Sequence, residues 1–142
     1  KKFPEIKDYM NTTINHCRKT GYVNNIFGRR CYITGINDRN YNVRNFQERA
    51  AINAPIQGSA ADVMRLAMIK INLDMKKNPN NKTKMLLQIH DELVFETPKS
   101  EIEKIIPIIK KNMSDVSRTE HHQFSIPLTV DINSGNNWGE AH

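Results

Sequence analysis

Apolar residues recur at spacings of three and four in three parts of the chain and predict helices there. The first helix should cover about residues 4–20 and end at Gly21, a residue that often follows a helix. The second should cover about residues 46–77. Pro55 lies inside it, lacks an amide hydrogen and should kink or split the helix. The part after Pro55 is broadly apolar, and we expect it to be largely buried. The third helix should cover about residues 100–116.

Shorter apolar runs with turn residues between them predict strands. One hairpin is expected over residues 22–33, turning at Gly28, and a second over 85–96, turning at His90-Asp91-Glu92. Apolar and polar residues then alternate over 126–132, which predicts a final half-buried strand. Antiparallel hairpins and helices in separate runs favour an α+β fold in which helices pack on one face of an antiparallel sheet. We find no repeat or linker that would divide residues 1–142 into domains.

The turn between the strands of the second hairpin is strongly acidic. Asp91 and Glu92 follow an apolar strand and precede another one. Carboxylates are costly to bring near a protein interior unless a cation meets them, and Mg²⁺ prefers oxygen ligands. This turn is therefore a candidate metal site. The alternative is an ordinary turn whose acidic side chains point into water.

The positive charge is concentrated in the first third of the chain. Of the net +6, residues 1–49 hold ten Lys or Arg against four Asp or Glu, and the remaining residues hold eleven of each. Arg29 and Arg30 lie in a stretch where arginines alternate with aromatic residues. Arginine suits phosphate oxygens, so this segment suggests nucleic acid. A solvated basic face is the alternative.

Arg49, Asn53 and Gln57 are four residues apart and should lie along one edge of the second helix, among small residues. Their side chains donate hydrogen bonds, and the DNA minor groove offers acceptors at nearly every base pair regardless of sequence. This donor row could therefore test base-pair geometry without reading sequence. The alternative is a tight helix-packing segment in which Gln57 bonds a backbone group.

Two long motifs closely resemble the palm region of the bacterial family A DNA polymerases: ERAAINAPIQGSAAD at residues 48–62 and QIHDELVFE at residues 88–96. The hairpin before them and the final residues of the chain also resemble this family. The resemblance implies that Asp91 binds catalytic Mg²⁺ and that Glu92 is its acidic neighbour. It implies minor-groove contacts near the primer end for His90 and for the donor row, and a position near the DNA backbone for Arg29 and Arg30.

The resemblance further implies template-directed addition of deoxynucleoside triphosphates to a primer 3′ end at a two-Mg²⁺ site. The family's other metal-binding aspartate, in a segment resembling DYSQIE, has no match here, nor does the helix that grips the incoming nucleotide. We therefore expect residues 1–142 to be the carboxyl-terminal part of a palm domain, inactive alone. The other aspartates, Asp62 and Asp74 among them, are interpreted as solvated or capping residues.

Two competing functions remain at this point. A non-catalytic nucleic-acid-binding module would use the arginines while Asp91 and Glu92 only form a turn. A metal-dependent phosphodiesterase would need a fuller set of His and carboxylate ligands. With two cysteines and no long apolar run, we expect a cytoplasmic protein that does not bind membranes. The resemblance implies that it is bacterial. An unpaired sheet edge could promote self-association of the isolated chain.

Overall fold

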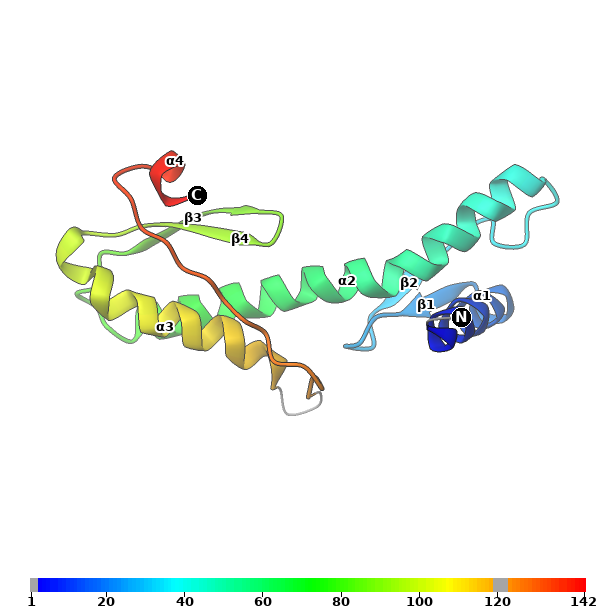
Figure 1. Cartoon of the computed structure of the whole chain (residues 1–142), viewed down its shortest axis with the longest axis horizontal. Coiled ribbons are helices and arrows are strands. Elements are labelled where there is room, and N and C mark those ends of the chain that lie inside the picture. The colour runs from blue at the N-terminus through cyan, green and yellow to red at the C-terminus, as the bar shows by residue number, and fades with distance from the viewer. Residues whose placement is uncertain (1–2, 119–122) are drawn as a thin grey trace. The chain divides into compact units, whose positions relative to one another are not determined.

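The computed structural model describes residues 3–118 and 123–142, and Figure 1 shows the order of the elements along the chain. These elements are, in sequence, α1 (Pro4–Thr20), β1 (Tyr22–Asn24), β2 (Arg30–Tyr32), α2 (Tyr41–Lys76), β3 (Lys84–Ile89), β4 (Glu92–Glu96), the 3-10 turn η1 (Lys99–Glu101), α3 (Ile102–Ser114), the 3-10 turn η2 (Asp115–Ser117) and α4 (Trp138–Ala141). The chain divides into two compact units, Lys1–Asp62 and Val63–His142. Helix α2 passes from the first unit into the second.

In the first unit, both predicted turns form as expected. Gly21 ends α1 with a φ of 79°, and its amide donates to the carbonyl of Cys17 at 2.7 Å. Gly28, with a φ of 80°, lies in the loop that joins β1 and β2. The two strands pair antiparallel, with Asn24 opposite Arg30. The hydrophobic core of the first unit contains Cys17, Val23, Ile33, Ile36 and Ala51.

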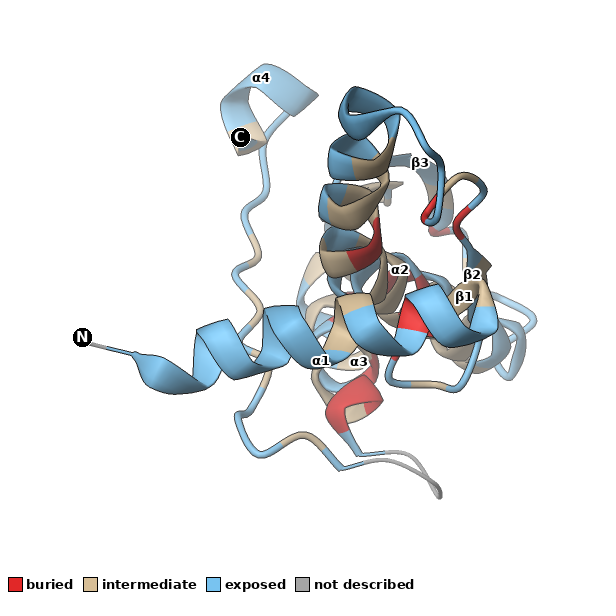
Figure 2. Ribbon diagram, turned by 90° about the vertical axis from the view of Figure 1, so that its right-hand side faces the viewer, coloured by how far each residue is buried: buried red, intermediate tan, exposed pale blue. Residues whose placement is uncertain are grey.

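The amphipathic helix α1 is confirmed, but most of its apolar face is not buried. Cys17 is its single buried residue within the described chain, and Figure 2 shows most of the helix as exposed. Ile6 and Met10 are among the exposed apolar side chains.

Helix α2 is longer and more continuous than the sequence predicts. It begins at Tyr41, because Asn40 Oδ1 accepts a hydrogen bond from the amide of Asn42 at 2.9 Å, a contact typical of a helix start. The helix runs through Pro55 without a break, so of the predicted kink or split, the split is wrong. Proline removes one amide donor, and this single loss is small beside the many other bonds of a 36-residue helix.

The predicted burial of α2 after Pro55 is also wrong within the described chain. Met64, Ala67 and Ile71 are buried, whereas Ile56 and Leu73 are well exposed. Apolar residues surround this part of the helix on several sides, and the described chain covers only some of those sides.

In the second unit, β3 and β4 pair antiparallel, and one face of this hairpin packs against α2 and α3. The buried residues Ile71, Ile105 and Ile109 come from α2 and α3. Half-buried Met85, Leu93 and Phe95 from the hairpin pack against them. The α+β class and the placement of helices on one face of the strands are therefore confirmed. The strands form two separate hairpins in the described residues, where the sequence analysis expected one sheet.

The predicted strand over residues 126–132 is wrong as a strand. The described residues there pair with no neighbouring backbone, although burial alternates over residues 127–132, with Leu128, Val130 and Ile132 half-buried. Ile126, expected on the same face, is 73% exposed. Alternation sets which side chains face the core, but a strand also needs a partner for its backbone groups. Among the described residues, no helix is long and apolar enough to span a membrane.

Candidate active site and nucleic-acid interface

The acidic turn lies at the tip of the β3–β4 hairpin, where the sequence predicts it, but Glu92 is the first residue of β4 and not part of the turn. Ile89 pairs with Glu92, so His90 and Asp91 form the two-residue loop between the strands. His90 has a φ of 52°, in the left-handed region that two-residue hairpin loops require. The side-chain amide of Gln88 donates to the carbonyl of His90 at 3.2 Å. The turn thus holds Asp91 on a well-defined backbone.

Asp91 and Glu92 are both exposed. Glu92 Oε1 lies 3.4 Å from Nδ1 of His142, whose ring stands edge-on to Trp138 with 6.2 Å between the ring centroids. In the described part of the chain, no three His, Cys, Asp or Glu side chains cluster closely enough to hold a metal ion. The oxygen donors suit Mg²⁺, but the turn supplies only part of a ligand set.

The donor row is exposed on α2. Arg49, Asn53 and Gln57 all lie in the first unit, and none of their side chains makes a hydrogen bond or ion pair with any residue that the structure describes. Neighbouring Ala50, Ala54 and Gly58 are small. The packing alternative, in which Gln57 bonds a backbone group, therefore has no support within the described chain. All three side chains keep their hydrogen-bonding capacity for a ligand.

The two arginines of the β1–β2 hairpin differ in their surroundings. Arg29 Nε lies 2.8 Å from Oδ2 of Asp62, and this hydrogen bond raises the pKa of Arg29. Arg30 lies over the ring of Tyr22, with 4.7 Å from its guanidinium carbon to the ring centroid, and makes no ion pair with the described residues. Arg30 therefore keeps its full charge for an outside partner.

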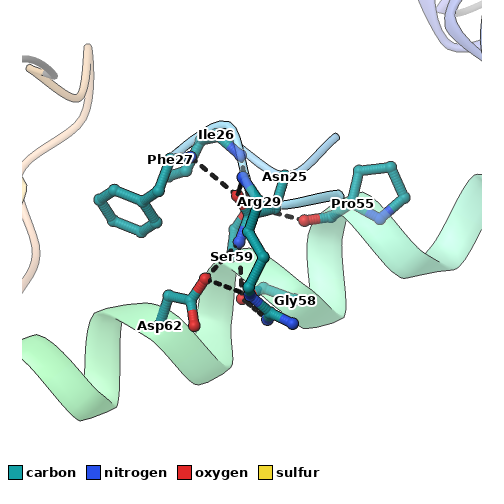
Figure 3. Close-up of polar contacts among 8 residues, drawn as sticks. All are labelled: Asn25, Ile26, Phe27, Arg29, Pro55, Gly58, Ser59 and Asp62. Carbon is teal, nitrogen blue, oxygen red and sulfur yellow. Dashed lines mark hydrogen bonds and ion pairs between the residues drawn. The ribbon is translucent and has the colours of Figure 1, made fainter. Parts of the chain in front are cut away.

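Asp62 corrects the interpretation of the remaining aspartates. It was expected to be solvated or capping, yet it is buried and bonded to Arg29 and to the side-chain amide of Asn25 (Figure 3). Asp74 is also bonded, to Asn112 and Lys77. Asn25 and Arg29 are 37 and 33 residues away from Asp62, and Asn112 is 38 residues away from Asp74, so local patterns gave no signal for these pairs.

The candidate residues are divided between the two units. Arg29, Arg30 and the donor row lie in the first, whereas His90, Asp91 and Glu92 lie in the second.

Comparison with known proteins identifies the family. The model of DNA polymerase family A matches residues 1–140. DNA polymerase I of Streptococcus pneumoniae (strain TIGR4) is 45% identical over 140 residues, which are 99% of this chain and 15% of that protein. DNA polymerase I of Rhizobium leguminosarum is 46% identical over 142 residues, 99% of this chain and 14% of that protein. This chain thus spans about 15% of the length of these relatives.

A solved structure is also similar. The POL domain of Pol1 from M. smegmatis, in complex with DNA primer-template and dNTP, superimposes with a TM-score of 0.86 at 36% identity, over 95% of this chain and 23% of that chain. The family match, the relatives and the structural likeness each cover nearly the whole chain and agree with one another. The chain therefore belongs to DNA polymerase family A.

Proposed function

We propose that residues 1–142 form the carboxyl-terminal part of the palm of a longer bacterial DNA polymerase, here called the longer polymerase. This enzyme adds deoxynucleotides to the 3′ end of a primer under the direction of a template. The observation that carries the proposal is the exposed carboxylate of Asp91, on a defined hairpin turn inside a motif of this family. The relatives' names and the DNA-bound structural neighbour support it.

Asp91 and Glu92 would hold Mg²⁺ together with a carboxylate from outside this chain. Bound Mg²⁺ supplies charge stabilisation for phosphoryl transfer at the primer 3′ hydroxyl. The chain's own contribution is to place two negative charges at one defined point. The β3–β4 pairing and the packing of Met85, Leu93 and Phe95 against α2 and α3 keep the turn in place.

Arg49, Asn53 and Gln57 would donate hydrogen bonds to minor-groove acceptors near the primer end, and His90 would contact the DNA beside the acidic turn. Because purine N3 and pyrimidine O2 are present at nearly every base pair, such contacts sense pairing geometry without reading sequence. Arg29 and Arg30 belong to the hairpin that would lie near the DNA backbone, and Arg30 has its charge free of ion pairs in the described structure.

Primer extension by the longer polymerase tests the proposal. Asp91→Asn removes a charge from the metal site and should abolish extension, while the affinity for primer-template changes little. Asp131→Asn is the matched control, because Asp131 is exposed in the same unit and has no partner within the described chain. It should extend normally. Extension by Asp91→Asn at the wild-type rate would contradict the proposal and favour a non-catalytic nucleic-acid-binding module.

We also propose that the isolated 142-residue chain is inactive and self-associates. The tip of its β3–β4 hairpin offers two carboxylates for a site that needs more, and Leu86 and Leu87 on β3 are about half exposed. Exposed apolar strands promote association. Primer extension above background by the purified chain would contradict its inactivity. A monomer at all concentrations in sedimentation would contradict its self-association.

A further inference from the structure

Two side chains of the β1–β2 hairpin converge on one short stretch of α2. Asn25 Nδ2 donates to the carboxylate of Asp62 and, at 3.2 Å, to the carbonyl of Gly58. Arg29 donates from Nε to Asp62 at 2.8 Å and from Nη2 to the same Gly58 carbonyl at 3.2 Å. Figure 3 shows these bonds, which join residues 29 to 37 positions apart in sequence. We call Asn25, Arg29 and Asp62 the anchor.

Asn25 also closes the turn that carries Arg29. Its Oδ1 accepts hydrogen bonds from the amides of Phe27 at 3.0 Å and Arg29 at 2.9 Å. Its own backbone amide donates to the carbonyl of Arg29 at 3.0 Å. The Asn25 residue is only 5% exposed. One buried side chain therefore shapes the turn and bonds it to the helix.

Small residues on α2 allow this close approach. A Cβ atom on Gly58 would already lie in van der Waals contact with Arg29 Nη2, at 3.4 Å. Ser59 Oγ accepts a hydrogen bond from the amide of Ile26 at 3.1 Å and donates to the carbonyl of Pro55. Through this bond, Ser59 links the hairpin contact to the turn of α2 that begins at Pro55.

The anchor lies on the opposite side of α2 from the donor row. Successive residues of an α-helix are separated by about 100° around its axis. Gly58, Ser59 and Asp62 therefore centre roughly 180° away from Arg49, Asn53 and Gln57. This agrees with the exposure of the donor row and its lack of partners in the described chain. The hairpin can hold the helix without covering the row.

We propose that Asp62 is a positioning residue, which fixes the DNA-facing side of α2 through Asn25 and Arg29, and that Arg29 acts through this anchor more than through contact with phosphate. The Asp62 side chain is only 12% exposed, so loss of Arg29 leaves its carboxylate poorly solvated. The Arg29 side chain is 46% exposed, so loss of Asp62 removes its ion pair but leaves the guanidinium in contact with water. The inference rests on the proposed function, because it requires that the donor row touch DNA.

The salt dependence of DNA affinity distinguishes an arginine that contacts phosphate from one that acts through the anchor. A side chain that neutralises a phosphate releases counterions, and its removal lowers the slope of log affinity against log salt by about one. In the longer polymerase, Arg30→Gln should lower this slope, whereas its neighbour Arg29→Gln should leave the slope unchanged. Arg29→Gln should instead reduce kcat for extension of a matched primer roughly ten- to a hundred-fold, as misplacement of a site by a distant change can do.

Asp62 is not expected to touch DNA. The Asp62→Asn variant should nevertheless show the same loss of kcat as Arg29→Gln. The double variant Asp62→Asn/Arg29→Gln should lose little more than either single variant, because both changes break the same anchor. A lower salt slope for Arg29→Gln together with normal kcat for Asp62→Asn would overturn the inference. If Asp62→Asn does not fold, Arg29→Gln and Ser59→Ala test the inference in its place. Ser59→Ala should lower kcat and leave the salt slope unchanged. A normal kcat in both of these variants would overturn the inference.

Alanine variants of the donor row distinguish the two proposals. If Arg49→Ala, Asn53→Ala and Gln57→Ala all extend primers normally, the row does not contact DNA, and the proposed function of the row fails first. If these variants are impaired while the anchor variants extend normally at full stability, only the positioning inference fails.

Discussion

Asn112 on α3 donates a hydrogen bond from Nδ2 to Oδ2 of Asp74 on α2, at 2.7 Å. The same amide donates to the carbonyl of Ile108 at 2.9 Å, and the Asn112 residue is buried. Lys77 bonds the other carboxylate oxygen of Asp74. A polar contact thus joins the two helices beside the apolar core of the second unit.

Asn112→Ala should lower the free energy of unfolding of the 142-residue chain. The change removes a buried hydrogen bond and leaves Asp74 with one fewer partner, which costs about 1–3 kcal/mol. Asn72→Ala is the matched control, since Asn72 is also helical but exposed, and it should change stability by no more than about 0.5 kcal/mol. Urea unfolding of both variants measures the difference. Equal stability of the two variants would show that the contact contributes nothing.

The pKa of Asp74 is lowered, first by the hydrogen bond from Lys77 and then by that from Asn112. A lowered pKa in the folded state means that the ionised form stabilises the fold above the unfolded pKa, near 3.9. This contribution is lost as pH falls through the folded pKa. The free energy of unfolding should therefore decrease on acidification below about pH 4, and Asp74→Asn should show a shallower decrease over that range. An unchanged slope in Asp74→Asn would contradict this assignment.

Ile71→Ala should be among the most destabilising changes in the second unit. Ile71 is 0% exposed and packs against Ile105 and Ile109, so truncation leaves a cavity and costs about 2–5 kcal/mol. Ile69, two residues earlier on the same helix, is 49% exposed, and Ile69→Ala should cost far less. Chemical unfolding compares the pair directly. A similar loss in both variants would mean that this core is not the one that stabilises the unit.

The backbone at His90 gives another prediction. Its φ of 52° strains most residues, and a β-branched side chain is strained most. His90→Val should destabilise the hairpin by about 1–2 kcal/mol, whereas His90→Gly should be neutral or stabilising. Hydrogen exchange of the β3 and β4 amides measures the effect locally. Equal protection in the two variants would refute a left-handed backbone at this turn.

The elements that sequence predicted well are those set by local chemistry. Gly21 and Gly28 adopt positive φ where a helix stops and where a hairpin loop turns, and both were identified from the residue type. The acidic loop at His90 and Asp91 was found in the same way, because two apolar strands border it.

The elements that sequence predicted poorly depend on distant partners. Residues 127–132 alternate in burial but have no described strand beside them. Asp62 resembled a solvated helix residue because its partners, Asn25 and Arg29, are 37 and 33 residues away. The metal site at Asp91 and the minor-groove contacts of the donor row were inferred from the chemistry of their side chains, and the family resemblance added their specific roles. Both stay predictions.

Gln57 offers the most direct test of the donor row. In the longer polymerase, Gln57→Ala removes a donor from an exposed side chain that bonds nothing in the described chain, so folding should be unaffected. If Gln57 bonds a minor-groove acceptor at the primer end, the loss of one hydrogen bond, about 0.5–1.5 kcal/mol, should slow primer extension by roughly two- to tenfold. Gln47→Ala is the control, because Gln47 lies on the same helix and packs near Gly35. Single-turnover extension should distinguish them: a selective loss in Gln57→Ala supports a contact at the primer end, and equal rates would place that contact elsewhere.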